Sequence, residues 1–297
     1  MLLRRLALAS VVANSVIVVT GGAVRLTSSG LGCPTWPRCT DSTFTPTEEY
    51  AVHGVIEFGN RLLTFVLLAV VVALLVVALR QGSRRVKRLA VLGFLGIPAQ
   101  AVLGGITVLT GLNPWTVMGH FLLSMVLIGL AVRLHDEVRA EPRRPVLPLL
   151  QRSATALLWL TAAVLVVGTV VTGSGPHSGD VLATRTGLDP ASMSQLHADL
   201  VMLLVGATAG LWVALRATGS PDHAVRAVRD LLVVEVAQGA LGFVQYATDL
   251  PVVLVALHLV GACVTLVAAV RLVLATRPRE TAQPVEAART APATARA

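Results

Sequence analysis

Charged residues are scarce in this chain: 13% of its 297 residues are Asp, Glu, Lys or Arg, whereas 55% are hydrophobic. A soluble domain carries about 25% charged residues, so the composition excludes an ordinary soluble fold and indicates an integral membrane protein. The first apolar run also lacks a small-residue cleavage site before the polar loop that follows it. We therefore expect this run to be a membrane helix and not a signal peptide, despite the nearby Arg4 and Arg5.

Eight apolar runs are long enough, or nearly so, to cross a hydrocarbon core of about 30 Å. They lie near residues 5–25, 51–79, 89–110, 115–134, 152–172, 194–215, 228–247 and 252–275. Most of the 24 basic residues precede the first run, follow the eighth, or lie between runs two and three, four and five, and six and seven. This asymmetry predicts a multi-pass protein of the cell membrane with both termini in the cytoplasm. It also accounts for the net charge of +8, which therefore gives no support to nucleic-acid binding.

Residues 100–120 and 238–258 match at a fixed offset of 138 residues, and both segments end in a histidine. Internal repetition predicts two copies of one unit. Because each unit has four helices, both copies enter the membrane from the same side, and the repeat is parallel. The shared positions are Gln100/Gln238, Leu103/Leu241, Gly104/Gly242, Thr110/Thr248, Leu112/Leu250, Val117/Val255 and His120/His258.

The predicted fold is an all-α integral membrane protein whose eight transmembrane helices form two parallel-repeat four-helix bundles. We expect an N-terminal half at 1–135, a cytoplasmic linker at 136–151 and a C-terminal half at 152–275. Residues 276–297 are rich in Pro and Ala and are predicted to form a disordered cytoplasmic tail. Because a four-helix bundle can hold a cofactor among side chains of facing helices, two units suggest two sites.

Two histidines of the second half are the strongest cofactor candidates. His197 and His258 each lie a few residues past the outer end of a helix that runs inward, so they share a depth. Two neutral imidazoles that converge in an apolar bundle are the arrangement that a six-coordinate haem iron needs. The alternative is a pair of hydrogen-bonded polar residues without a metal. His135 and His223 lie in cytoplasmic segments beside arginines and are expected to be solvated surface residues. His177 lies in an outer loop, where we favour a role in the loop over a role in supporting a ligand.

The first half differs from the second at one position. His120 is the counterpart of His258, but Asn60 stands where the counterpart of His197 is expected. His53 precedes Asn60 by two helical turns and Glu57 lies between them, so all three share one helix face. Arg61 follows Glu57 by four residues and can pair with it. Glu57 beside an iron site can act in proton transfer, whereas a purely structural Glu57–Arg61 ion pair is the alternative.

Cys33 and Cys39 lie in the first outer loop, in the segment GLGCPTWPRC. Their spacing, with prolines between them, suits a small disulfide loop in an oxidising compartment. A metal pair would lack further cysteine or histidine ligands in that loop, and thiol exchange beside a redox site is a further alternative. Cys263 lies within an apolar run and is expected to be a packing residue.

These motifs resemble the haem A synthase family in its bacterial form with one outer-loop cysteine pair. The segments GGAVRLTSSGLGCPTWPRC, IEFGNRLLT, TGSGPHSGD and SQLHADL occur in order, together with the two Gln…His repeats. The resemblance implies an oxidoreductase that converts the C8 methyl of haem O to the formyl of haem A by successive hydroxylations, for terminal oxidase biogenesis. It implies a haem b cofactor between His197 and His258, and a substrate haem near His120 with Glu57 and Arg61 as catalytic residues. The implied partners are haem O synthase, terminal oxidase assembly proteins and further copies of the chain in a homo-oligomer.

One position departs from the family's pattern. The commonest motif on the second helix is Glu-x-x-His-Arg, but this chain has Asn60 in place of the histidine. Either His53 replaces it from two turns away, about 10.5 Å along the helix axis, or the substrate haem is held mainly through His120.

Two other classes of protein use similar features. A di-haem b-type electron-transfer protein would have paired ligands in both halves, which Asn60 opposes. A parallel-repeat transporter would have broken helices at matching positions of the two halves, but Pro98 has no counterpart in the second half. The sequence has no flavin or nicotinamide motif, so a redox enzyme of this kind needs an external electron donor or acceptor.

Overall fold

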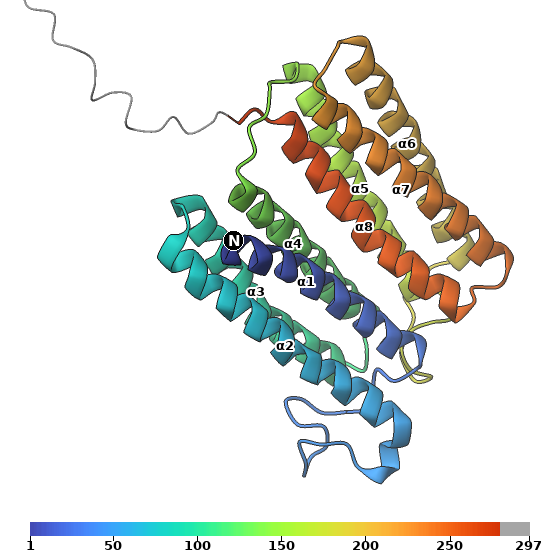
Figure 1. Ribbon diagram of the computed structural model, residues 1–297. Coiled ribbons are helices and arrows are strands. Elements are labelled where there is room, and N and C mark those ends of the chain that lie inside the picture. The colour runs from blue at the N-terminus through green and yellow to red at the C-terminus, as the bar shows by residue number, and fades with distance from the viewer. Residues whose placement is uncertain (280–297) are drawn as a thin grey trace, which may run out of the picture.

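The structure, a computed structural model, describes residues 1–279. Within this range the chain is almost entirely α-helical, in agreement with the predicted all-α class (Figure 1). A short 3₁₀ helix, Glu48–Tyr50, precedes the second long helix. The long helices are α1 (Leu2–Leu26), α2 (Ala51–Gln81), α3 (Arg84–Leu109), α4 (Pro114–Arg139), α5 (Pro148–Ser174), α6 (Pro190–Ala217), α7 (Asp222–Ala247) and α8 (Val252–Thr276).

Seven of these eight helices, all except α7, are long and apolar enough to cross a membrane. The length of α7 is sufficient, but the helix carries five charged residues: Asp222, Arg226, Arg229, Asp230 and Glu235. Each charged residue raises the free energy of placing a helix in hydrocarbon. The chain is therefore a multi-pass membrane protein, and the prediction of eight spanning helices is confirmed for seven of them.

The helix ends follow local sequence signals. Ser83 accepts a hydrogen bond from the backbone N–H of Val86 and caps the start of α3. Asp189 caps α6 through the N–H of Ser192, and Pro190 occupies the first helical position. A proline there leaves no helical hydrogen bond unmade, because the first N–H groups of a helix have no partner within it.

The helices pack in two groups. In the first group, α1 and α3 each contact α2 and α4; in the second, α5 and α7 each contact α6 and α8. The groups meet through α1, α4, α5 and α8, as Figure 1 shows. Apolar side chains from all four helices, including Val18, Ile128, Leu165 and Cys263, fill the junction. The predicted packing role of Cys263 agrees with its burial there.

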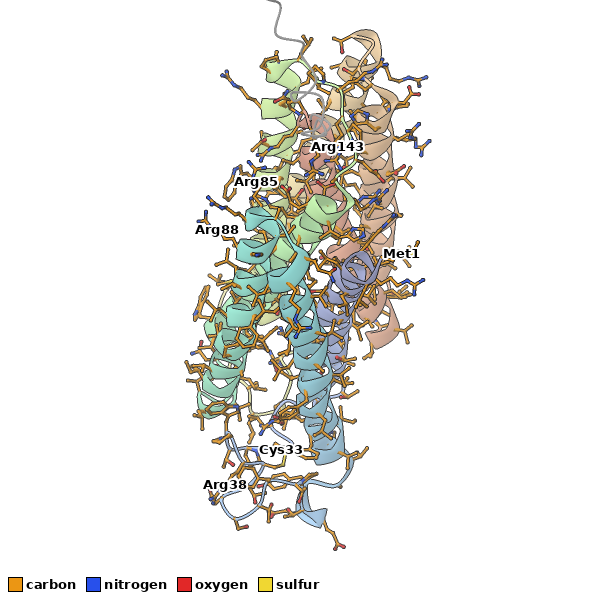
Figure 2. The ribbon with its side chains drawn as sticks, turned by 60° about the vertical axis from the view of Figure 1, so that its left-hand side comes forward. Met1, Cys33, Arg38, Arg85, Arg88 and Arg143 are labelled. Atoms are coloured by element: carbon orange, nitrogen blue, oxygen red, sulfur yellow. A yellow bond between two sulfur atoms is a disulfide. The ribbon has the colours of Figure 1, made fainter. Side chains whose placement is uncertain are left out.

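The two ends of the molecule carry different side chains. Figure 2 shows Arg85, Arg88 and Arg143 toward one end, whereas Cys33 and Arg38 lie at the other. A polar loop, residues 27–47, therefore extends the end at which α2 begins.

The segment that joins the two groups is tied down by ion pairs. Asp136, near the end of α4, pairs with Arg143 of the joining segment and with Arg279, whose Nη2 lies 3.0 Å from Oδ2. Arg143 and Arg279 also bond to each other through their backbones. Of the tail predicted at 276–297, Thr276 ends α8 and Arg279 makes these contacts, and the remainder (280–297) lies outside the described residues.

Candidate functional site

His197 and His258 lie near the starts of α6 and α8, and each ring rests against a glycine of a neighbouring helix. A Cβ placed on Gly168 of α5 would lie 3.0 Å from Cε1 of His197, and one on Gly242 of α7 would lie 3.5 Å from Cε1 of His258. The two histidines lie on diagonally opposite helices of the second group, since α6 and α8 both contact α5 and α7. Nδ1 of His258 is buried and has no hydrogen-bond partner among the described residues. Two such rings offer the nitrogen donors that a six-coordinate haem iron requires.

His120 occupies the equivalent place in the first group of helices. Its ring rests against Gly104 of α3, where a Cβ would lie 3.1 Å from Cε1, and its Nδ1 is likewise buried without a partner within residues 1–279. His120 and His258 thus share one packing arrangement, a histidine on the second helix of a hairpin over a glycine on the first.

Two glutamines hold the backbone beside these histidines. Gln100 donates from Nε2 to the carbonyl of His120 at 3.1 Å, and Gln238 donates to the carbonyl of His258 at 2.9 Å. These glutamines and the glycines Gly104 and Gly242 mark the repeat in the sequence, where no role at the site was predicted for them. Because the same residue types accompany the histidine in both copies, the sequence could have indicated a role for them at the site.

Asn60 takes a place in the first group like that of His197 in the second. It lies on α2 and faces α1, where its Oδ1 accepts a hydrogen bond from the Thr20 hydroxyl at 2.8 Å. A Cβ on Gly21 would lie 3.8 Å from Nδ2 of Asn60. A side chain on the second helix of a hairpin thus again lies over a glycine of the first, but here it is an amide bound to a hydroxyl.

His53 lies at the outer loop. Its Nδ1 is hydrogen-bonded to the Ser29 hydroxyl at 2.9 Å, and the backbone of Gly32 packs against its carbonyl. None of the hydrogen bonds of residues 1–279 joins His53 to His120. The structure therefore brings His53 together with the loop that follows α1.

Glu57 and Arg61 form an ion pair that clamps the cysteine loop. The Arg61 Nε donates to Glu57 Oε1 at 3.1 Å, and the other carboxylate oxygen accepts the N–H of Cys33 at 2.8 Å. The Arg61 guanidinium also donates to the carbonyls of Cys33, Thr35 and Arg38. Glu57 is buried, with 6% of its surface exposed, so its charge is met by donors and not by water.

Cys33 and Cys39 are joined by a disulfide, and both are completely buried. The predicted disulfide is therefore confirmed. Residues 1–279 contain no group of three or more His, Cys, Asp or Glu side chains suited to a bare metal ion.

Arg25 links the two groups of helices at the end of the molecule that carries the disulfide. Its Nε donates to the carbonyl of His177 at 2.6 Å, and its Nη2 donates to the carbonyl of Thr172 at 2.9 Å. The ring of His177 bonds through Nε2 to the carbonyl of Leu250 at 2.9 Å. These contacts give His177 a structural role in the loop, as the sequence indicated.

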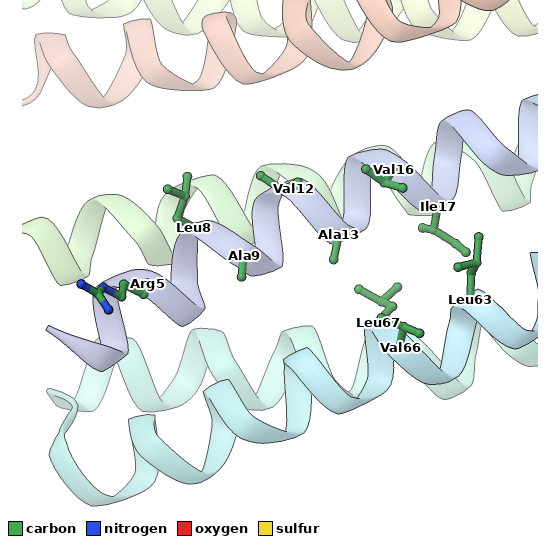
Figure 3. Close-up of a pocket in the computed structure, with 10 residues that line it drawn as sticks. All are labelled: Arg5, Leu8, Ala9, Val12, Ala13, Val16, Ile17, Leu63, Val66 and Leu67. Carbon is green, nitrogen blue, oxygen red and sulfur yellow. The ribbon is translucent and has the colours of Figure 1, made fainter.

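An apolar groove of about 450 Å³ runs between α1 and α2 (Figure 3). Its walls are aliphatic, with Leu8, Val12 and Ile17 from α1 and Leu63 and Val66 from α2 among them, and Arg5 stands at one end. Ile17 lies three residues before Thr20 on α1, and Leu63 lies three residues after Asn60 on α2. The groove therefore begins about one helical turn from the hydrogen-bonded pair of Thr20 and Asn60.

The chain has relatives of known name. A family model described as Cytochrome oxidase assembly protein (COX15-CtaA) matches residues 4–177, more than half of the chain and short of His197. The Heme A synthase of Geobacillus thermodenitrificans is 29% identical over 141 residues, which are 46% of this chain and 42% of that protein. The Heme A synthase of Shewanella oneidensis is 27% identical over 187 residues, 58% of this chain and 56% of that protein.

A Protoheme IX farnesyltransferase of Haloarcula marismortui is 31% identical over 144 residues, which are 46% of this chain and 30% of that protein. The matched segments thus span less than two thirds of the length of each of these three relatives.

Proposed function

Because this chain belongs to the COX15-CtaA family of cytochrome oxidase assembly proteins, we propose that it is a haem A synthase, an oxidoreductase that converts haem O to haem A. The observation that carries the proposal is that the two groups of helices share one arrangement around a histidine and differ on the helix across from it. Both groups of helices build the same glycine, histidine and glutamine contact, around His120 and His258. In the second group His197 on α6 lies diagonally across from the helix of His258, whereas in the first group the corresponding helix, α2, carries Asn60 and the buried Glu57.

We assign the resident cofactor, haem b, to the second half, with His197 and His258 as its axial ligands. The packing of each ring against a glycine and the buried, unpartnered Nδ1 of His258 within residues 1–279 support this fit. Haem iron supplies the electron-transfer chemistry there when bound. Gln238 fixes the backbone of His258, and Gly168 and Gly242 leave room for the two rings to take their positions.

We assign the substrate haem O to the first half, with its iron near His120. Since the Asn60 amide is a poor iron ligand and His53 is bound to Ser29, His120 is the main protein ligand in this proposal. The apolar groove between α1 and α2 supports entry of an apolar substrate from the bilayer. Glu57 then holds or releases a proton near the C8 methyl, while Arg61 and the Cys33 N–H keep the carboxylate in place.

The two halves, 1–135 and 152–275, are proposed to be parallel repeats joined by the linker at 136–151. The matching pattern of helix contacts in the two groups supports this relationship. We place the protein in the cell membrane with both termini in the cytoplasm. The arginines at one end and the disulfide at the other support that orientation, because the disulfide needs an oxidising compartment. The proposed partners are haem O synthase, terminal oxidase assembly proteins and an external electron donor or acceptor.

The test of the proposed reaction is Glu57→Gln. The variant is produced in cells that make haem O and lack any other haem A synthase, and extracted haems are separated into haem B, O and A. We expect the variant to keep its haem B and accumulate haem O, while haem A falls at least 100-fold, as expected when a proton-transfer group is removed.

Glu141→Gln is the matched control, since Glu141 is an exposed carboxylate at the opposite end, paired with Arg139. It should make haem A like the unaltered protein. Haem B alone in cells that carry the unaltered protein would contradict the proposal and would favour an electron-transfer protein. A Glu57→Gln variant that still makes haem A would remove Glu57 from the mechanism.

A further inference from the structure

Glu235 is a buried carboxyl to which the proposed function gives no role. It lies near the middle of α7 with 3% of its surface exposed. Its Oε1 accepts a hydrogen bond from the hydroxyl of Thr208 on α6 at 3.1 Å, and Thr208 is completely buried. The second carboxyl oxygen, Oε2, is buried and has no hydrogen-bond partner within residues 1–279.

The first half shows that the fold does not need a polar pair at this place. Under the offset of the repeat, Glu235 corresponds to Ile97, and under the offset that aligns Asn60 with His197, Thr208 corresponds to Val71. Val71 and Ile97 belong to one apolar cluster, which also includes Leu127 of α4. An acid and a hydroxyl thus replace an aliphatic contact in the second half alone, although burying them costs free energy.

No counter-ion reaches Glu235 from the elements packed against α7. On α6 the titratable or charged groups are His197, Asp199 and Arg216, and on α8 they are His258, Cys263 and Arg271. Asp199 is bound by Gln195, Arg216 stacks on Trp212, and Cys263 packs in the junction between the two groups of helices. None of the ion pairs within residues 1–279 includes Glu235, and on its own helix Arg229 pairs with Asp230 and Arg226 with Asp222.

Glu235 lies on the inner side of the His197–His258 pair. It precedes Gln238 by one helical turn, and Gln238 holds the carbonyl of His258. On α6, Thr208 follows His197 by eleven residues, about 16 Å of helix rise. A change of charge at the histidine pair is expected to alter the proton affinity of the Glu235 carboxyl group, because the apolar medium between them screens charges weakly.

We propose that Glu235, positioned by Thr208, is the proton-binding group that compensates electron transfer at the His197–His258 centre. The inference rests on the proposed function, because it requires a one-electron centre between these histidines. When an external one-electron donor reduces the centre, its net positive charge falls by one, and the Glu235 carboxylate takes up one proton from water to become a neutral acid. When the electron leaves, the acid releases that proton.

The test is a redox titration of the purified full-length protein in detergent, repeated across a series of pH values. The midpoint potential of the second-half centre should fall as pH rises, by up to about 59 mV per pH unit, which is the equivalent of a tenfold change for a one-electron couple. In Glu235→Gln the dependence should weaken or vanish, because an amide cannot take up the proton. The carboxyl groups of the haem also titrate, so the difference between the two proteins carries the conclusion.

Glu141→Gln is again the control, since this exposed carboxylate lies outside both halves' interiors, and it should keep the original pH dependence. Thr208→Val removes the hydrogen bond to Oε1 and should move the pH range of the dependence without abolishing it. Reduction-induced infrared difference spectra should gain the C=O stretch of a protonated carboxyl in the unaltered protein, and Glu235→Gln should lack it.

A pH dependence that is equal in the unaltered protein and Glu235→Gln would overturn the proposal and leave Glu235 as a structural contact between α6 and α7. That result is separable from a failure of the proposed function, since haem A formation would continue. If Glu235→Gln does not fold, Thr208→Val and the infrared spectra of the unaltered protein decide the question. An unaltered protein without a haem spectrum would overturn both proposals together.

Discussion

At the scale of single residues, small side chains decide where the candidate ligands lie. Gly21, Gly104, Gly168 and Gly242 each face a polar side chain of the next helix in the chain. A ring can approach a helix closely only where the facing residue has no Cβ. The histidines could be identified as candidates from the sequence. The glycines that pack against them could be identified only from the structure, because they lie on neighbouring helices.

Gly168→Ala tests this packing. The added Cβ would lie 3.0 Å from Cε1 of His197, so the ring must move. Overpacking of this kind costs about 1–3 kcal/mol, and we expect haem binding in the second half to weaken by roughly 10- to 100-fold. The measurement is haem content and affinity from optical titration of the purified protein.

Gly206→Ala is the matched control, because a Cβ at Gly206 on α6 has nothing within 4 Å. This variant should bind haem normally and be slightly more stable, since alanine favours a helix over glycine by about 0.5–1 kcal/mol. Equal haem binding in the two variants would show that the ring of His197 does not depend on Gly168.

At the scale of the elements, the outer loop and the start of α2 act as one structure. The disulfide closes the loop, while Glu57 and Arg61 hold its backbone from α2. The loop therefore provides a hydrogen-bond donor, the Cys33 N–H, to the buried carboxylate of Glu57. Any change that opens the loop is expected to reach Glu57 without altering it directly.

Reduction of the disulfide should loosen this unit. A short disulfide loop contributes about 2 kcal/mol, at the lower end of the usual range, so we expect a lower Tm and faster proteolysis between residues 34 and 49 in the presence of reductant. The double variant Cys33→Ser with Cys39→Ser should show both effects without reductant and no further change when it is added. A Tm of the unaltered protein that ignores reductant would contradict a stabilising role for the bond.

At the scale of the whole molecule, the two halves are joined at both ends. Arg25 binds the carbonyls of Thr172 and His177 at the end that carries the disulfide. At the other end, Asp136 binds Arg143 and Arg279, which follow α4 and α8. The apolar junction between them includes side chains of α1, α4 and α8. The halves are therefore expected to unfold together.

Asp136→Asn should destabilise this union. Breaking a fully buried ion pair costs about 3–5 kcal/mol, and since Arg143 and Arg279 are partly exposed we expect roughly 1–3 kcal/mol and a lower Tm. Asp222→Asn is the control, because its contact with Arg226 is long, at 3.9 Å, and exposed, and such pairs contribute at most about 1 kcal/mol. Similar unfolding temperatures for the two variants, measured by differential scanning calorimetry in detergent, would contradict the stabilising role of Asp136.

Much of the fold could be predicted because membrane helices depend on local composition. The apolar runs near 51–79 and 194–215 correspond to α2 and α6, which extend to Ala51–Gln81 and Pro190–Ala217. The helices are longer than the runs because polar residues continue a helix beyond the hydrocarbon at little cost. The run near 228–247 was predicted as spanning, but its helix begins at Asp222 and includes the charges that keep α7 below the threshold for a membrane span.

The candidate site was less predictable, because contacts between distant residues decide it. Sequence spacing grouped His53, Glu57 and Asn60 on one face of a helix, and the structure gives each a different partner, in Ser29, Cys33 and Thr20. Glu235 could not be identified as a candidate from its surroundings in the sequence, because a single acidic residue in an apolar run forms no motif with its neighbours. Its contrast with Ile97 in the other half was the available signal.

The sequence by itself determined that this is a helical membrane protein with a repeated Gln…His unit and an outer cysteine pair, and its motifs indicated the family. These properties follow from composition, periodicity and residue identity, which are local. Only the tertiary structure decided that the cysteine loop holds Glu57, that glycines face the histidines and that Glu235 has no ion-pair partner within residues 1–279. Those properties depend on which helices face each other, and that is settled by packing across the whole chain.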